Sequence, residues 1–174
     1  MRKVLIVVDM QNDFITGALG SDEARAIVPN VADKVRSMGR EDIVLFTRDT
    51  HYADYMDSLE GKYLPVEHCI KGTEGWQIIP ELGELEANGV VNKYTFGCNE
   101  WPDIFENEDM EDVEFELCGV CTDICVVSNA LALRMFYPDV KITVDASCCA
   151  GVTPEKHAAA LEVMKSCQIE VINE

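Results

Sequence analysis

The chain has 174 residues, the usual length of one domain, so we expect residues 1–174 to form a single domain. Hydrophobic residues make up 48% and charged residues 26%, a composition that excludes a disordered chain. The formal net charge of −18 argues against nucleic acid or an anionic membrane surface as the partner, because their phosphates would be repelled.

The first residues mimic the start of a secretory signal. Two basic residues precede the apolar run 4–8, but the run ends at Asp9 and is shorter than the roughly 7–15 residues of a signal core. No run approaches the ~18 apolar residues of a membrane span. We therefore expect a cytoplasmic protein whose eight cysteines are mostly reduced thiols.

Short apolar runs alternate along the chain with segments of helical spacing. The expected strands are 3–8, 42–47, 89–92, 113–120, 140–144 and 168–172, and the expected helices are 27–38, 76–85, 123–136 and 154–167. This alternation predicts an α/β fold in three layers: a six-stranded, mostly parallel sheet of Rossmann-like topology with helices on both faces. The segment 51–75 is too long to be a mere connection, so we expect it to be functional.

Polar side chains follow the predicted strands at the points where the strands end. Asp9 follows the first strand, Asp49 and His51 follow the second, and Lys93 follows the third. In open α/β sheets, ligands bind beyond the carboxyl ends of the strands. We therefore expect these groups to meet at one edge, together with a thiol from the segment after the fourth strand.

That thiol is Cys125, in the expected first turn of the helix 123–136. The helix dipole, the free backbone amides and a nearby Lys93 would favour a thiolate, so we expect a lowered pKa for Cys125. Asp9 could accept its proton. The alternative is that Cys125 is a small buried side chain, and position alone leaves both interpretations open.

Asp49 and His51 are two residues apart, which places both side chains on the same side of an extended chain. A carboxylate and an imidazole suit a divalent transition metal, and His68 could supply a third ligand. Coordination positions left open would make this a catalytic or substrate-binding site. The alternative is that the two histidines are partly exposed loop residues.

Five motifs, in this order along the chain, resemble the isochorismatase-like cysteine hydrolases, and within them the nicotinamidases. The motifs are VVDMQNDF at 7–14, TRDTH at 47–51, HCIKGT at 68–73, Lys93, and GVCTDICV at 119–126. The resemblance covers nearly the whole chain. It implies an amidase that cleaves a small carbon–nitrogen bond through a thioester, most simply nicotinamide to nicotinate and ammonia in pyridine nucleotide salvage.

The resemblance also implies roles for single residues. Cys125 would be the nucleophile, Asp9 the general base that later protonates the leaving ammonia, and Lys93 the cation that stabilises the thiolate. The backbone amides of Cys121 and Cys125 would form an oxyanion hole. The peptide between Val120 and Cys121 matches the place where the family has a non-proline cis bond.

Asp49, His51 and His68 match the metal ligands of nicotinamidases, in which the metal holds the pyridine nitrogen. We expect zinc, with manganese or iron as alternatives. Phe14 matches an aromatic residue that packs on the substrate ring. Family members are commonly oligomers, so a homo-oligomer is expected as well.

Other functions are compatible with parts of the sequence. A family amidase for a carbamoyl or ureido compound would keep Asp9, Lys93 and Cys125 but generally lacks the metal ligands, whereas isochorismatase proper lacks the nucleophilic cysteine. Cys118 and Cys121 have the Cys-x-x-Cys spacing of thiol–disulfide proteins and, with Cys125, could bind zinc. Cys118 falls within an apolar strand, which argues against both. A non-catalytic binding protein on this fold is a further alternative.

The sequence predicts different roles for the two cysteines of the 119–126 motif. We expect Cys125→Ala to abolish ammonia release from an amide substrate, because it removes the nucleophile, while circular dichroism shows an intact fold. Cys121→Ala should retain turnover, because only its backbone amide is expected to act. An inactive Cys121→Ala variant beside an active Cys125→Ala variant would reverse the assignment.

Overall fold

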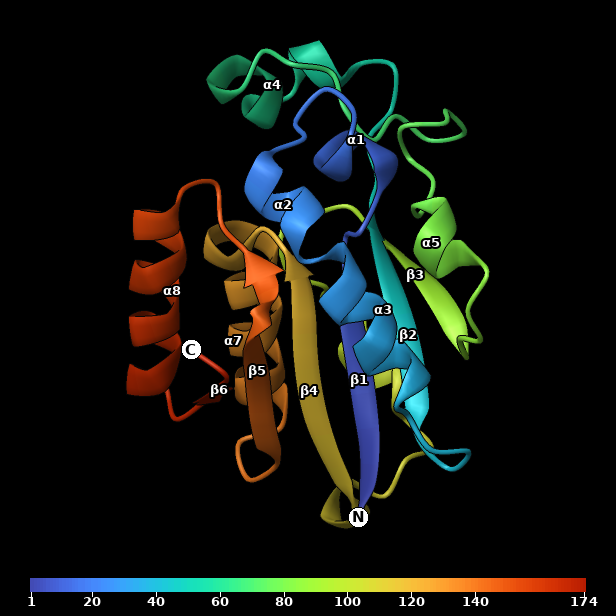
Figure 1. The fold of residues 1–174 in the computed structure, drawn as a ribbon, viewed down its shortest axis with the longest axis vertical. Coiled ribbons are helices and arrows are strands. Elements are labelled where there is room, and N and C mark those ends of the chain that lie inside the picture. The colour runs from blue at the N-terminus through green and yellow to red at the C-terminus, as the bar shows by residue number, and fades with distance from the viewer.

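A six-stranded sheet with the order β3-β2-β1-β4-β5-β6 forms the centre of the fold (Figure 1). The computed structural model describes residues 1–174. Every neighbouring pair of strands is parallel, so the predicted, mostly parallel sheet is confirmed and is parallel throughout. The strands are β1 Arg2–Val8, β2 Ile43–Asp49, β3 Gly89–Lys93, β4 Val113–Val120, β5 Lys141–Ala150 and β6 Glu170–Ile172.

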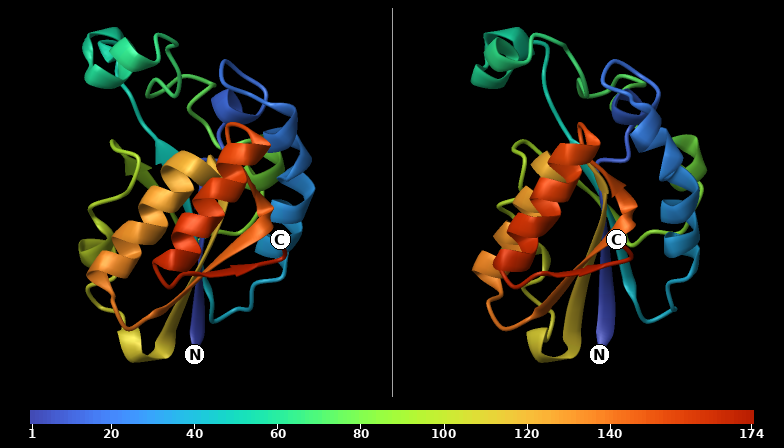
Figure 2. Two further views of the ribbon diagram at one scale, coloured as in Figure 1. Left: turned by 90° about the vertical axis from the view of Figure 1, so that its left-hand side faces the viewer. Right: turned by 60° about the vertical axis from the view of Figure 1, so that its left-hand side comes forward.

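Helices cover both faces of the sheet, as predicted. Figure 2 shows α7 and α8 on one face and α2 and α3 on the other. The α-helices are α1 Asn12–Ile15, α2 Asp22–Ala26, α3 Val28–Arg36, α4 Leu59–Tyr63, α5 Pro80–Gly83, α6 Trp101–Ile104, α7 Val127–Phe136 and α8 Pro154–Ser166. The helical turns of other types are η1 Tyr55–Asp57, η2 Met110–Asp112 and η3 Thr122–Val126. None of the helices has the length and apolarity that a membrane span requires.

Two predicted helices differ from the structure. The segment 76–85 is helical only in α5, because a proline at position 80 lacks an N–H and suits the first helical turn rather than the interior. The predicted helix 123–136 begins in a wider turn of π type, η3, which then continues as α7. The segment 51–75 contains η1 and α4, which the sequence pattern does not reveal.

The core explains why the strands lie where they do. Val4–Val8 of β1 is wholly buried, as expected for a continuous apolar run in the middle of a sheet covered on both faces. A single cluster of 40 buried residues joins this strand to the helices on both sides. This continuity supports our proposal that residues 1–174 form one domain.

A buried ion cluster ties α3 to the sheet at a distance from the strand ends. Lys34 of α3 contacts Glu116 of β4 and lies 2.7 Å from Asp145 of β5, while Lys3 Nζ lies 2.8 Å from Glu116. Burial raises the pKa of both carboxyls, but hydrogen bonds from the lysines outweigh it and lower each pKa below its ordinary value. The ion cluster therefore stabilises the fold fully at a pH above the pKa values that Glu116 and Asp145 have in the unfolded chain. This stabilisation is lost as the pH falls through the lower pKa values that they have in the folded chain.

We expect Lys34→Met to destabilise the fold by about 3–5 kcal/mol near pH 7, because it leaves the buried carboxylate of Asp145 without its cation and Glu116 with Lys3 alone. The penalty should shrink at about pH 3, because the carboxyls of the unfolded chain are then protonated and those of the folded chain are losing their charge. Urea unfolding at the two pH values measures both effects. Lys156→Met, at an exposed position of α8, is the matched control and should stay within about 0.5 kcal/mol of the parent. An equal loss for Lys34→Met at both pH values would contradict this account.

Candidate active site

The polar residues predicted to meet do lie together at the carboxyl edge of the sheet. The sheet register brings this about, since Asp49 pairs with Lys93 across β2 and β3, and Val8 pairs with Gly119 across β1 and β4. Asp9 and the turn η3 therefore begin side by side, directly next to the Asp49–Lys93 pair.

Asp9, Lys93 and Cys125 form a buried group. Lys93 Nζ lies 2.6 Å from Asp9 Oδ2 and donates a hydrogen bond of 3.4 Å to Cys125 Sγ. Asp9 Oδ1 accepts a hydrogen bond of 2.6 Å from the Thr47 hydroxyl. Asp9 Oδ2 receives no aligned hydrogen bond in spite of its ion pair with Lys93, so this oxygen is available to accept a proton.

The protonation of this group differs from the expectation for Cys125. Burial raises the pKa of the Cys125 thiol well above its ordinary value, the charge of Asp9 raises it further, and Lys93 only partly opposes them. The predicted lowering of the Cys125 pKa is therefore wrong for the resting site. Burial also raises the pKa of Asp9, whereas the pKa of Lys93 is raised in spite of its burial by the charges around it. The resting group thus combines a neutral thiol with an ammonium.

The turn that carries Cys125 has a tightly constrained start. Gly119 has a φ of +114°, and a Cβ there would lie 2.1 Å from the Val8 carbonyl oxygen, so only glycine fits. The Val120–Cys121 peptide is cis, as the resemblance implied. The Cys121 carbonyl then accepts hydrogen bonds from the amides of residues 124 and 126, which closes η3 around Cys125.

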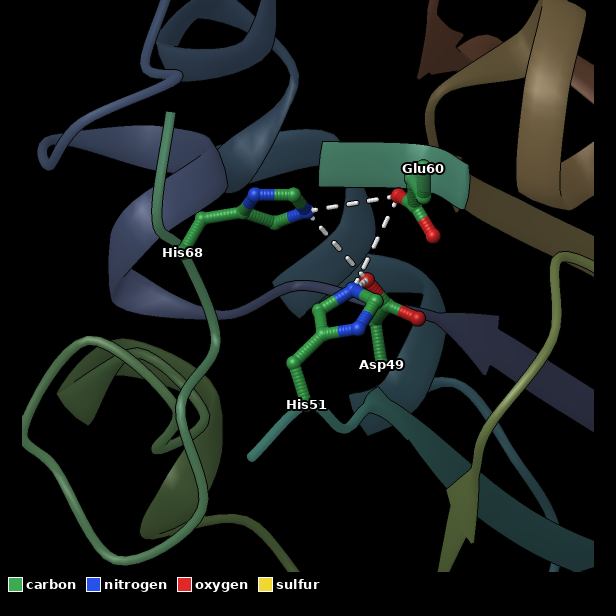
Figure 3. Close-up of side chains that lie close together, drawn as sticks. All are labelled: Asp49, His51, Glu60 and His68. Atoms are coloured by element: carbon green, nitrogen blue, oxygen red, sulfur yellow. Dashed lines mark hydrogen bonds and ion pairs between the residues drawn. The ribbon is translucent and has the colours of Figure 1, made fainter. Parts of the chain in front are cut away.

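Beside this group, four side chains from separate elements point at one another (Figure 3). Asp49, His51, Glu60 and His68 each offer a ligand atom, and all four atoms lie within 4.8 Å of one another. Asp49 Oδ2 is 2.9 Å from His51 Nε2 and 3.6 Å from His68 Nε2, and Glu60 Oε1 is 3.7 Å from both nitrogens. The three predicted ligands are brought together, and Glu60 of α4 joins them.

Backbone hydrogen bonds explain how the segment 51–75 brings His68 to the metal-binding cluster. The His51 amide donates to the Cys69 carbonyl over 3.0 Å, and the Lys71 amide donates to the His51 carbonyl over 2.8 Å. This short parallel bridge lays the chain around His68 against residue 51. Glu60 enters from the opposite side on α4, whose first turn is capped by the Ser58 hydroxyl.

The cluster fits a divalent transition metal. Zinc ligands at about 2.0–2.2 Å lie roughly 3.3–3.6 Å from one another in a tetrahedral site, close to the spacing of the four ligand atoms here. His68 donates through Nδ1 to the Val66 carbonyl over 2.8 Å, which leaves Nε2 free to bind a metal. Burial raises the pKa of Asp49, but its contacts with His51 and His68 and the charge of Lys93 outweigh burial and hold the pKa far below its ordinary value.

Sequence reasoning missed two residues of the site. Glu60 lies in a five-residue helix inside a segment without periodicity, and the only local signal was Ser58 as a possible N-cap. Gln11 belongs to the first motif, and its wholly buried side chain holds the backbone of Asp49. The Gln11 amide accepts from the Asp49 N–H over 2.8 Å and donates to the Asp49 carbonyl over 2.9 Å.

A cavity of about 570 Å³ opens above both groups. Phe14 lines it, with its ring 5.5 Å from the ring of His68, centroid to centroid. Most of the lining is apolar, and the charged side chains in it are the carboxylates of Asp49 and Glu60, with no lysine or arginine. The cavity therefore suits a small, largely apolar molecule without a negative charge.

Comparison with known proteins agrees with this fold. The model of the isochorismatase domain family matches residues 3–174, so the chain belongs to the isochorismatase family. It is 28% identical to the nicotinamidase/pyrazinamidase of Mycobacterium tuberculosis, with 98% of each chain covered.

Solved structures give the same picture. The pyrazinamidase of Pyrococcus horikoshii in complex with zinc is 27% identical, with a TM-score of 0.84 and all of both chains covered. N-carbamoylsarcosine amidase of Thermoplasma acidophilum is 25% identical, with a TM-score of 0.78, 98% of this chain covered and 95% of the other. These findings confirm the predicted enzyme class, a hydrolase of carbon–nitrogen bonds other than peptide bonds.

We expect one divalent transition ion per chain in protein purified without chelators, as measured by elemental analysis. Glu60→Gln should weaken zinc binding by about tenfold or more, because the amide carries no charge to balance the ion. Glu67→Gln, at an exposed position of the same segment, should leave the affinity unchanged. Equal zinc affinity in the Glu60→Gln variant and its parent would remove Glu60 from the ligand set.

Proposed function

We propose that this chain is a cysteine-dependent amidase that hydrolyses nicotinamide to nicotinate and ammonia. The observation that carries the proposal is the placing of Lys93 Nζ, 2.6 Å from Asp9 Oδ2 and 3.4 Å from Cys125 Sγ. Cys125 lines a cavity that is also lined by Asp49, Glu60 and His68 of the metal-binding cluster. The names of its relatives in the family support the same activity.

In the first half of the reaction, Cys125 forms a thioester. Asp9 Oδ2 accepts the thiol proton, and Sγ forms a bond to the amide carbon while the carbonyl oxygen becomes an oxyanion. Lys93 stabilises the sulfur as it gains negative charge. The backbone amides of Cys121 and Cys125 are the proposed donors to the oxyanion, a contribution of roughly 2.7–4 kcal/mol for each donor in comparable enzymes.

The second half releases both products. Asp9 returns its proton to the amide nitrogen, the carbon–nitrogen bond breaks, and ammonia leaves. A water molecule then gives a proton to Asp9 and attacks the thioester carbon, and the carbon–sulfur bond breaks. The Cys125 thiolate recovers the proton from Asp9, and the product leaves as the carboxylic acid, which gives its proton to the solvent and becomes nicotinate.

The cavity supports a pyridine amide as the substrate. Asp49, His51, Glu60 and His68 would hold a divalent metal, which supplies a Lewis acid for the ring nitrogen when bound. Phe14 is placed to pack against the ring, because it lies beside His68 and lines the same cavity. Zinc is the proposed metal, with manganese or iron as alternatives.

The structural similarity to N-carbamoylsarcosine amidase makes a carbamoyl compound the second candidate substrate. Sarcosine derivatives carry a carboxylate, and the cavity lining offers no lysine or arginine to pair with it, only the further carboxylates of Asp49 and Glu60. A bound divalent metal would offset the charge of these two carboxylates and could hold a pyridine nitrogen, which a sarcosine derivative does not have, so the metal-binding cluster favours nicotinamide. Cys118 is wholly buried in β4, which argues against thiol–disulfide exchange with Cys121.

The cytoplasmic location, the homo-oligomer and the absence of nucleic-acid and membrane partners stay predictions. The net charge of −18 supports the absence of nucleic-acid partners.

The decisive experiment measures ammonia release and nicotinate formation from nicotinamide, with N-carbamoylsarcosine assayed in parallel. Asp9→Asn should lower kcat by about 10²–10⁴-fold, because it removes the base but keeps the shape of the side chain. Asp139→Asn, at an exposed position before β5, is the matched control and should keep full activity. Faster hydrolysis of N-carbamoylsarcosine than of nicotinamide would favour the second candidate instead.

A further inference from the structure

Asn129 is a wholly buried amide on α7, four residues after Cys125. Its Nδ2 donates to the Cys125 carbonyl over 2.8 Å and to the Phe96 carbonyl over 3.2 Å. Its Oδ1 accepts from the Cys98 amide over 2.9 Å and from the Trp101 indole over 3.1 Å. One side chain thus joins the turn of the nucleophile to the segment that follows β3.

The same two segments meet again through Lys93. Lys93 Nζ donates to Cys125 Sγ over 3.4 Å and to the Thr95 carbonyl over 3.3 Å. Thr95 is the neighbour of Phe96, so the contacts form a closed ring from Cys125 through Lys93 and residues 95–96 to Asn129 and back to Cys125. In such a ring, the position of Lys93 relative to the sulfur depends on the bonds that Asn129 makes.

Phe96 extends the consequence to the substrate cavity. Its side chain lines that cavity, and its carbonyl is the one that Asn129 holds. The Gly97 backbone also lies close to α7, since a Cβ there would be 3.0 Å from the Ser128 carbonyl oxygen. Loss of the Asn129 bonds would therefore release both the wall of the cavity and the backbone that bonds Lys93.

Only an asparagine satisfies all four partners. Two donors from one nitrogen and two acceptor lone pairs on one oxygen are the full capacity of the amide, and all are used here. An aspartate lacks the donors, a serine or threonine has one donor, and a glutamine is one methylene longer. Any replacement of Asn129 therefore leaves at least one buried hydrogen-bonding group without its partner, which costs stability.

We propose that Asn129 is a positioning residue for this reaction: it sets the place of Lys93 relative to the Cys125 sulfur and holds the Phe96 wall of the cavity. The proposal rests on the proposed amidase function for its kinetic readout. The proposal also predicts a change in the reactivity of the Cys125 thiol, which is measured without substrate. The positioning role of Asn129 and the proposed amidase function can therefore fail separately.

The test compares Asn129→Asp with Asn30→Asp, a control at an exposed amide of α3 that bonds the Ser147 carbonyl and does not line the cavity. We expect kcat for nicotinamide to fall by about tenfold or more in Asn129→Asp, since small displacements of reacting groups are costly. The fall in kcat should exceed the rise in KM, because Lys93 acts in the chemical step whereas the Phe96 wall acts on substrate binding. Assays well below the melting temperature keep the protein folded.

The second readout is the rate at which iodoacetamide alkylates Cys125 at fixed pH, followed by mass spectrometry of the intact protein and its peptides. The proposal expects this rate to change by about threefold or more in Asn129→Asp, because Lys93 no longer has a fixed place beside the sulfur. Asn30→Asp should match the parent in both readouts. Asn129→Ser, which loses bonds without adding a buried charge, replaces Asn129→Asp if the latter does not fold.

The outcomes separate the alternatives. A lower melting temperature with unchanged kcat and unchanged alkylation would show a purely structural asparagine and overturn the proposal. An altered alkylation rate in a protein whose parent does not hydrolyse nicotinamide would support the positioning role while removing the proposed function. Loss of kcat together with altered alkylation supports both.

Discussion

The buried ammonium of Lys93 is the interaction on which the whole site depends. It lies 2.6 Å from Asp9 Oδ2 and 3.4 Å from both Asp49 Oδ1 and Cys125 Sγ, and its side chain is inaccessible to water. A charge buried in this way is tolerated only when opposite charges surround it. Lys93 and the carboxylates of Asp9 and Asp49 therefore stabilise one another. The proposed nucleophile, Cys125, contacts the same ammonium and belongs to the same group of charges.

Asp49 links this unit to the metal-binding cluster. Its Oδ1 faces Lys93 and its Oδ2 faces His51 and His68. The same carboxylate can therefore pair with the Lys93 ammonium and bind a metal ion held by the two histidines. Asp9, Asp49 and Glu60 together carry three negative charges against the single fixed charge of Lys93 once they are ionised. A divalent ion at the cluster would balance that excess, which is an electrostatic reason, independent of ligand geometry, for the fit of a metal.

Much of this site could be predicted from sequence because the sheet is parallel. The apolar runs indicate the strands, and Asp9, Asp49 and Lys93 lie where three of these runs end. Because the strands are parallel, their carboxyl ends lie at one edge of the sheet. Glu60 could not be found in this way, since it comes from a short helix whose position depends on tertiary packing. Asn129 has no signal in its neighbourhood either, because its four partners come from segments brought together only by the fold.

The pKa of Cys125 is raised, whereas reasoning from its local sequence predicted that it is lowered. The neutral thiol that results suits the proposed reaction. A helix start and a nearby lysine favour a thiolate, but complete burial and the charge of Asp9 outweigh them, so the resting sulfur keeps its proton. The leaving ammonia needs a proton at the same buried site. A neutral thiol brings that proton with it, and Asp9 Oδ2, which receives no aligned hydrogen bond, can carry it from sulfur to nitrogen.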